Sequence, residues 1–308
     1  MKRLQNQIAG SRYTLPVTMI YGALVWLLAG LIQHQWWLQF ALFNVAALLM
    51  LEFTNINVLI RIYSRSVSSA FVMLSCAAVF LFPSTAGAAI QLILIASLIT
   101  LFRCYQDKMS TGWTFYTFLC LGLASVIDIH VVYLLPAYWI IMAWHLYSMS
   151  WRTFLASILG LIAPYWFMLA WLFFLGEEGW LLAGAHFAAL GDVMFPIDYT
   201  VLSLPRILFF VLMVGLGITG TVHFVRTSSR DKIRTRQLYY SFILLGTVAI
   251  LLLALQPQLY DLMIRVLLIT TSPLIGHFVA LTSTKVTNIA FLTIVVVVLA
   301  LTVYCLWM

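Results

Sequence analysis

The chain alternates long apolar stretches with short polar gaps along its whole length. A helix needs about 20 mostly apolar residues to cross the hydrocarbon core of a bilayer, and eleven stretches come close to that length or exceed it. We therefore predict an all-α fold, a polytopic membrane bundle of about 11 transmembrane helices. The predicted spans are Pro16–Gln33, Trp36–Ile60, Val67–Phe82, Ala86–Phe102, Gly112–Ile127, Val131–Tyr147, Phe154–Gly176, Leu204–Val225, Leu238–Leu255, Leu259–Leu281 and Val286–Met308.

Basic residues assign a side to each end of these helices. Fourteen of the 16 lysines and arginines fall in alternate gaps or in the N-terminal tail, which holds Lys2 and Arg3. Only Arg206 and Arg265 lie near the other gaps. Because the short cytoplasmic loops of membrane proteins carry the excess of Lys and Arg, the bias predicts a cytoplasmic N-terminus and an outer C-terminus. Most acidic residues lie near the outer side, which membrane insertion does not require.

The longest outer gap has structure of its own. Its apolar run Trp180–Phe187 predicts a helix that lies on the membrane surface, and the segment Gly191–Tyr199 reads as irregular. The third to sixth spans are short for a bilayer, and tight outer turns join them into two hairpins.

Composition agrees with a single membrane domain over residues 1–308. Hydrophobic residues make up 64% of the chain, charged residues 8%, and the mean hydropathy is +1.06, whereas about a quarter of the residues in a soluble domain are charged. The net charge of +7 is spread over the loops without a basic, aromatic-rich patch, so nucleic acid is excluded as a partner. Lipid headgroups are the expected partners of these basic residues.

The order of motifs between Phe80 and Trp171 resembles a known group of enzymes. The motifs are Pro83, Leu101-Phe102-Arg103-Cys104-Tyr105, Leu121-Gly122-Leu123-Ala124-Ser125, Asp128-Ile129-His130, Tyr133-Leu134-Leu135-Pro136, Trp151-Arg152 and Pro164-Tyr165. They resemble the middle helices of C-type, polyprenyl-phosphate-dependent membrane glycosyltransferases. Most of the chain is also similar to an uncharacterised family of multi-pass inner-membrane proteins of Bacteroidota. The first resemblance implies transfer of a sugar from a polyprenyl-phosphate carrier at the outer face of the membrane.

The chain departs from the glycosyltransferase pattern at one place. Those enzymes carry a catalytic carboxylate in a long outer loop after the first helix, whereas the gap here is only His34-Gln35. A shared fold would therefore need a base from another outer loop, or the activity would be lost.

Asp128 and His130 are the first candidates for such chemistry, since a carboxylate beside an imidazole can transfer protons. The alternative is a polar turn in which the Asp accepts backbone N–H groups. Asp192 and Asp198 are a second pair of candidates, because the irregular segment that holds them can bend back toward the bundle. A carboxylate of this kind would deprotonate an acceptor or hold a divalent metal ion, which is the one candidate cofactor; the alternative is a solvated loop.

Arg265 lies inside the tenth predicted span, with Asp261 one helical turn earlier. An arginine within a membrane span usually marks a polar site, and its guanidinium suits a phosphate group. The alternative is an Asp261–Arg265 pair that neutralises itself. Arg206 either joins Arg265 around an anionic headgroup or extends to the membrane interface.

Three classes of function remain open from the sequence. The first is a glycosyltransferase-like enzyme that uses Asp128, His130, Asp192 or Asp198. The second is a non-catalytic scaffold subunit that binds membrane proteins of an envelope assembly. The third is a transporter with Glu52, Asp261 and Arg265 along a polar path, although no repeat relates two halves of the chain.

Overall fold

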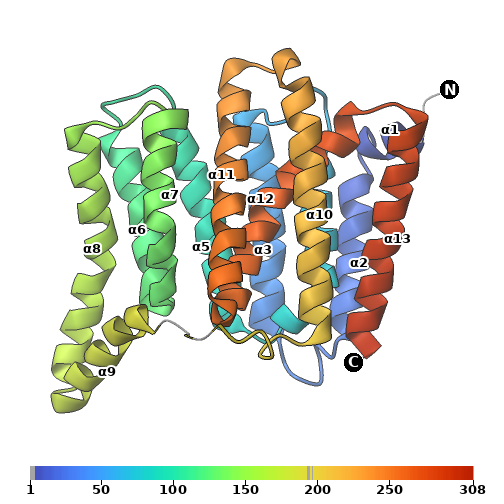
Figure 1. Ribbon diagram of the computed structural model, residues 1–308. Helices are drawn as coiled ribbons and strands as arrows, with labels where there is room; N and C mark the ends of the chain where they lie inside the picture. Colours follow the sequence, from blue (N-terminus) through green and yellow to red (C-terminus); the bar gives the residue numbers. More distant parts are fainter. Residues whose placement is uncertain (1–3, 193–194, 196, 308) are drawn as a thin grey trace.

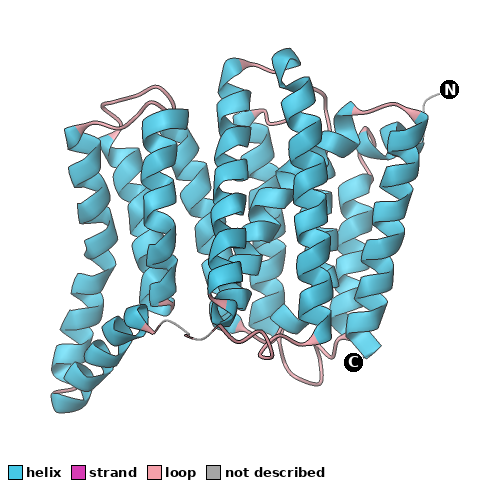
Figure 2. Ribbon diagram, in the orientation of Figure 1, coloured by secondary structure: helices cyan, strands magenta, loops and turns pink. Residues whose placement is uncertain are grey.

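The computed structural model describes residues 4–192, 195 and 197–307, and every regular element among them is a helix (Figures 1 and 2). Lys2, Arg3, Met308 and positions 193, 194 and 196 of the predicted irregular segment lie outside the described residues. The α-helices are α1 Leu4–Ala9, α2 Thr14–Leu28, α3 Trp37–Asn57, α4 Ser66–Ala77, α5 Thr85–Leu101, α6 Thr111–Ile127, α7 Leu135–Ile140, α8 Trp151–Phe174, α9 Glu177–Ala188, α10 Leu204–Thr227, α11 Ile233–Leu255, α12 Tyr260–Leu281 and α13 Lys285–Trp307.

Seven of the described helices are long and apolar enough to cross a membrane. Four shorter apolar helices accompany them, at Thr14–Leu28, Ser66–Ala77, Thr111–Ile127 and Ile129–His145. The last of these joins a 3-10 turn, α7 and a π-helical turn. Each of the eleven predicted stretches overlaps one of these helices. The all-helical, multi-pass prediction is therefore confirmed, and length alone supports seven crossings.

Helix α12 forms the centre of the larger group of helices. Its most apolar window is buried throughout, and α4, α5, α10 and α11 pack around it. A helix that is apolar on all sides belongs in the interior of a bundle. Its polar residues consequently face other helices and not lipid.

Helices α5 to α8 form the other part of the molecule, with α8 at its edge (Figure 1). Two glycines allow α6 and α8 to approach closely: a Cβ on Gly122 would lie 2.5 Å from the carbonyl oxygen of Leu161, and one on Gly160 would overlap that of Phe115. Small residues at such crossings let membrane helices pack backbone to backbone. Helix α9 then turns back from α8 at Gly176, whose φ is +64°.

The basic connections meet at one end of the bundle. Arg61 lies 3.8 Å from Asp231 and donates to the carbonyl of Arg230, while Arg234 donates to Asn57 and to the carbonyl of Phe102. The N-terminus is at this end, and α9 and the C-terminus are at the other (Figure 1). The charge bias seen in the sequence is therefore a separation between the two ends of the fold.

Candidate functional site

A cavity of about 300 Å³ opens at the end of the bundle where α9 lies. The start of α5, the turn after α6, the end of α9 and the first turns of α12 enclose it. The residues that line it are Ser84, Ala86, Gly87, Ile90, Ile127, Asp128, Ile129, His130, His186, Ala189, Asp261, Leu262 and Arg265. Four of the seven candidate residues from the sequence, Asp128, His130, Asp261 and Arg265, thus border one cavity.

Arg265 is the cation of this cavity, and its side chain is almost fully enclosed, with the residue 3% exposed. Its Nη1 donates to Oε1 of Gln91 at 3.0 Å and its Nη2 to the carbonyl oxygen of Leu81 at 2.8 Å. Nε has no hydrogen-bond partner among the described residues. Both acceptors are neutral, so these bonds leave the positive charge uncompensated.

Gly87 makes room for this guanidinium. A Cβ at position 87 would lie 2.6 Å from both Nε and Nη2 of Arg265, too close for any real contact. The turn before α5 fixes this glycine, because the hydroxyl of Ser84 accepts a hydrogen bond from its backbone N–H at 3.0 Å. The helix cap therefore also positions the surface against which Arg265 lies.

Asp261 makes no ion pair with Arg265 within 4.0 Å, so the predicted alternative of a direct pair within α12 is not formed. Its partner is Arg206 of α10, whose Nη2 lies 3.2 Å from Oδ1 and donates to Oδ2 at 3.4 Å. No carboxylate in the described part of the chain lies within 4.0 Å of Arg265. The reason is tertiary: Arg206 is placed over the rings of Phe80 and Tyr260 and so meets Asp261 from outside the helix.

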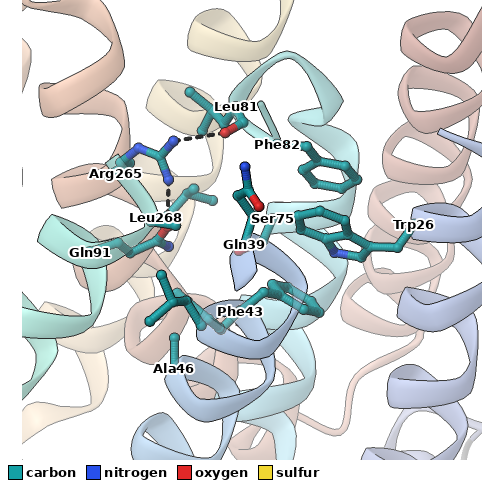
Figure 3. Close-up of a pocket in the computed structure, with 13 residues that line it drawn as sticks. Trp26, Gln39, Phe43, Ala46, Ser75, Leu81, Phe82, Gln91, Arg265 and Leu268 are labelled. Atoms are coloured by element: carbon teal, nitrogen blue, oxygen red, sulfur yellow. Dashed lines mark hydrogen bonds between the residues drawn. The ribbon is translucent and has the colours of Figure 1, made fainter. Parts of the chain in front are cut away.

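A second, smaller cavity of about 30 Å³ borders Arg265 as well (Figure 3). Trp26, stacked on Phe82 at 3.8 Å, and Ser75 lie on its wall. Trp26 Nε1 and Ser75 Oγ have no partner among the described residues, and the space suits about two water molecules. This side of Arg265 fits water, whereas the larger cavity has room for a ligand headgroup.

Asp128 and His130 form a direct pair on the opposite wall of the larger cavity. Oδ1 of Asp128 lies 2.7 Å from Nδ1 of His130 and accepts the backbone N–H of His130 at 3.0 Å. Nε2 of His130 lies 3.1 Å from the carbonyl oxygen of Ala189. A carbonyl oxygen only accepts, so Nε2 must carry a proton to bond Ala189. The contact between Nδ1 and Asp128 is then a hydrogen bond only if a second proton lies between them. The pair also caps its turn, as the structural alternative required.

The end of α9 closes one side of the cavity. His130 contacts Ala189, and Tyr133 donates to the carbonyl oxygen of Leu190 at 2.5 Å. His186 of α9 lines the cavity, and its Nε2 is buried without a partner in the described structure. The helix predicted for Trp180–Phe187 is therefore present within α9, and it contributes a third titratable group.

Asp192 and Asp198 do not line the cavity. Both residues are exposed, and Asp198 accepts hydrogen bonds from the hydroxyl and the backbone N–H of Thr200 at 2.7 and 2.8 Å. These bonds, the hydroxyl first, lower the pKa of Asp198. In this structure the two carboxylates belong to the solvated loop.

Metal and transport chemistry find less support in the same geometry. Within the described ranges, no three His, Cys, Asp or Glu side chains are placed to hold a metal ion. Glu52 is exposed on α3 and lines neither of the two cavities that Arg265 borders. The polar path that would join Glu52 to Arg265 is absent from these cavities.

The comparisons gave no match for the chain among family models, curated proteins or solved structures. The fold and the site alone define the class: a multi-pass helical membrane protein with a polar cavity at one end of the bundle, bordered by a buried arginine and by an Asp–His pair.

Proposed function

We propose that the protein acts at the outer face of the bacterial cytoplasmic membrane as a glycosyltransferase-like enzyme on a polyprenyl-phosphate-linked sugar. The observation that carries the proposal is the buried charge of Arg265 beside a cavity of about 300 Å³. A buried cation needs an anion for compensation, and phosphate is the anion that guanidinium binds best. The resemblance of residues 80–171 to C-type glycosyltransferases supports the choice of carrier.

Asp128 and His130 supply the chemical part of this proposal. Transfer breaks the bond between the anomeric carbon of the sugar and the phosphate oxygen, and polyprenyl phosphate leaves. The acceptor oxygen forms a new bond to the anomeric carbon as its hydroxyl loses its proton. A carboxylate–imidazole pair exchanges such protons at a fixed position. The pair borders the same cavity as Arg265, so a phosphate on Arg265 leaves the sugar near the two proton-transferring groups.

The separation of charge supports the proposed location. The basic connections gather at the N-terminal end, which the distribution of Lys and Arg assigns to the cytoplasm. The cavity is at the opposite end (Figure 1). A substrate presented at the outer leaflet would enter from that side.

Binding and turnover of a short-chain polyprenyl phosphate and its hexosyl derivative test the proposal. In nanodiscs, we expect Arg265→Gln to weaken binding of both compounds at least tenfold, and Arg152→Gln, an exposed arginine at the other end, to leave binding unchanged. Asp128→Asn and His130→Gln should retain binding but stop loss of sugar from the carrier in native membranes. Binding that survives in Arg265→Gln would rule out the proposed site.

A scaffold function is the second candidate, and α8 is the observation that favours it. This helix packs mainly on α6 and α9 and presents exposed aromatic side chains, at Trp166, Phe167, Trp171, Phe173 and Phe174. Trp and Tyr are enriched at membrane and protein interfaces. Stoichiometric protein partners after purification from the native membrane, lost on Trp166→Ala and Trp171→Ala, would favour the scaffold.

A further inference from the structure

Three polar atoms without hydrogen-bond partners belong to residues that line the larger cavity. They are Nε of Arg265, Oδ1 of Asp261 and Nε2 of His186. Buried polar groups in folded proteins nearly always have a hydrogen-bond partner, so a group of them at one cavity needs an explanation. They come from two helices far apart in the sequence, α9 and α12, which excludes a purely local cause.

The three atoms ask for different partners. Nε–H of an arginine only donates, and an oxygen of an ionised carboxylate only accepts. A phosphate oxygen satisfies the first but repels the second, whereas a hydroxyl group donates to a carboxylate. His186 Nε2 accepts or donates according to its tautomer. A bare phosphate therefore leaves Asp261 unsatisfied, and a ligand with a phosphate and a hydroxyl matches both residues.

We propose that Asp261 binds a free hydroxyl of the ligand whose phosphate binds Arg265, so that the cavity selects a phosphorylated polyol headgroup over a bare phosphate. The inference rests on the proposed function, because it takes Arg265 as the phosphate site. Asp261 and Arg265 are one helical turn apart, a spacing that brings side chains to neighbouring positions on one face. A phosphate and a hydroxyl on the attached sugar span such a distance.

The ion pair with Arg206 leaves Asp261 able to take this role. Arg206 donates to Oδ2 at 3.4 Å, and its 3.2 Å contact with Oδ1 is an ion-pair contact outside hydrogen-bond geometry. An ionised carboxylate has about four lone-pair sites, so Asp261 keeps acceptor capacity for a ligand hydroxyl while it pairs with Arg206. Arg206 itself does not line the cavity, so the ion pair does not occupy the ligand's space.

The test compares two probes that differ only in the hydroxyl-bearing part, a short-chain polyprenyl phosphate and the same compound carrying a hexose. In nanodiscs, the natural chain should bind the hexosyl compound about tenfold more tightly, the value of one good hydrogen bond to a charged group. Asp261→Leu should abolish this preference and leave affinity for the bare phosphate the same or higher. Asp261→Asn, in which the side chain keeps nearly the same shape, should give an intermediate preference. It is the control for misfolding of the leucine variant.

Arg206→Gln is the matched control, since it removes the same ion pair without changing the cavity wall. It should keep most of the preference for the hexosyl compound. An unchanged preference in both Asp261 variants overturns the assignment to Asp261 and leaves the phosphate site intact. Equal loss in Arg206→Gln and Asp261→Leu also overturns it, because the ion pair would then be the cause.

Two further outcomes separate this inference from the proposed function. Binding of both probes that is insensitive to Arg265→Gln refutes the phosphate site, and the role of Asp261 falls with it. Hexose 1-phosphate, a soluble probe, distinguishes the source of the ligand. If it binds as tightly as the hexosyl lipid and remains sensitive to Asp261→Leu, the hydroxyl assignment holds and the lipid carrier is refuted.

Discussion

Replacing Gly87 by alanine tests how the structure holds Arg265. The new Cβ would stand 2.6 Å from Nε and Nη2, and ordinary contact begins near 3.4 Å. The guanidinium must therefore move by roughly 0.8 Å. If the movement draws Nη2 away from Leu81, the 2.8 Å bond stretches to a length at which it is no longer a hydrogen bond.

The size of the effect follows from two opposing contributions. Alanine favours a helix over glycine by up to about 1 kcal/mol, whereas a lost hydrogen bond to a charged group costs about 1.5–3 kcal/mol. Loss of the bonds to both Gln91 and Leu81 would outweigh the helix propensity. We expect Gly87→Ala to lower the free energy of unfolding by about 0.5–3 kcal/mol if one bond is lost and by about 2–6 kcal/mol if both are lost, and to weaken phosphate binding.

Gly112→Ala is the matched control for this experiment. Gly112 also lies in the first turn of a helix, and a Cβ there would meet nothing within 4 Å. It should leave stability unchanged or slightly raised. Thermal unfolding in mild detergent and binding of a short-chain polyprenyl phosphate are the measurements. If the two alanine variants behave alike in both assays, the argument that Gly87 positions the guanidinium is refuted.

Three other predictions concern the two ends of the bundle. Asp231→Leu should destabilise the fold by about 1–3 kcal/mol, because His277, whose side chain is 0% exposed, loses its 3.0 Å bond to Asp231; an unchanged thermal midpoint would contradict this. Thr200→Val should raise the pKa of Asp198 toward its ordinary value in an NMR titration, because the variant loses the hydroxyl that donates a hydrogen bond to the ionised carboxylate and stabilises it. In a cysteine-free background, a membrane-impermeant maleimide added outside spheroplasts should label Thr200→Cys and spare Ser229→Cys, and the reverse would invert the proposed orientation.

The helices could be predicted from the sequence because length and hydropathy decide where a membrane helix forms. Each predicted stretch overlaps a helix, and Trp180–Phe187 lies within α9. The ends were less exact. The first stretch was predicted to reach Gln33, but α2 ends at Leu28, since Gly30 has a φ of +94° that no continuing helix adopts.

The composition of the site could be predicted only in part. Asp128, His130, Asp261 and Arg265 each lie near the outer end of an apolar stretch, so the pattern placed them at one end of the bundle. The partners of Arg265 could not be found in this way. Gly87 has no side chain, so the sequence pattern gives no sign of its contact with Arg265. The pairing of Asp261 depends on where α10 places Arg206 in the folded bundle.

Helix α12 shows why the charge of Arg265 is difficult to explain by structure alone. Because the helix is enclosed by others, Arg265 meets solvent only through the two cavities that it borders, and its two acceptors, a carbonyl and an amide oxygen, are neutral. A neutral donor would satisfy both at a lower desolvation cost, since burial of an uncompensated charge is among the most expensive features a fold can contain. Asp261, one helical turn earlier on the same face, forms its ion pair with Arg206. An anion in the adjoining cavity, as we propose, would compensate this charge.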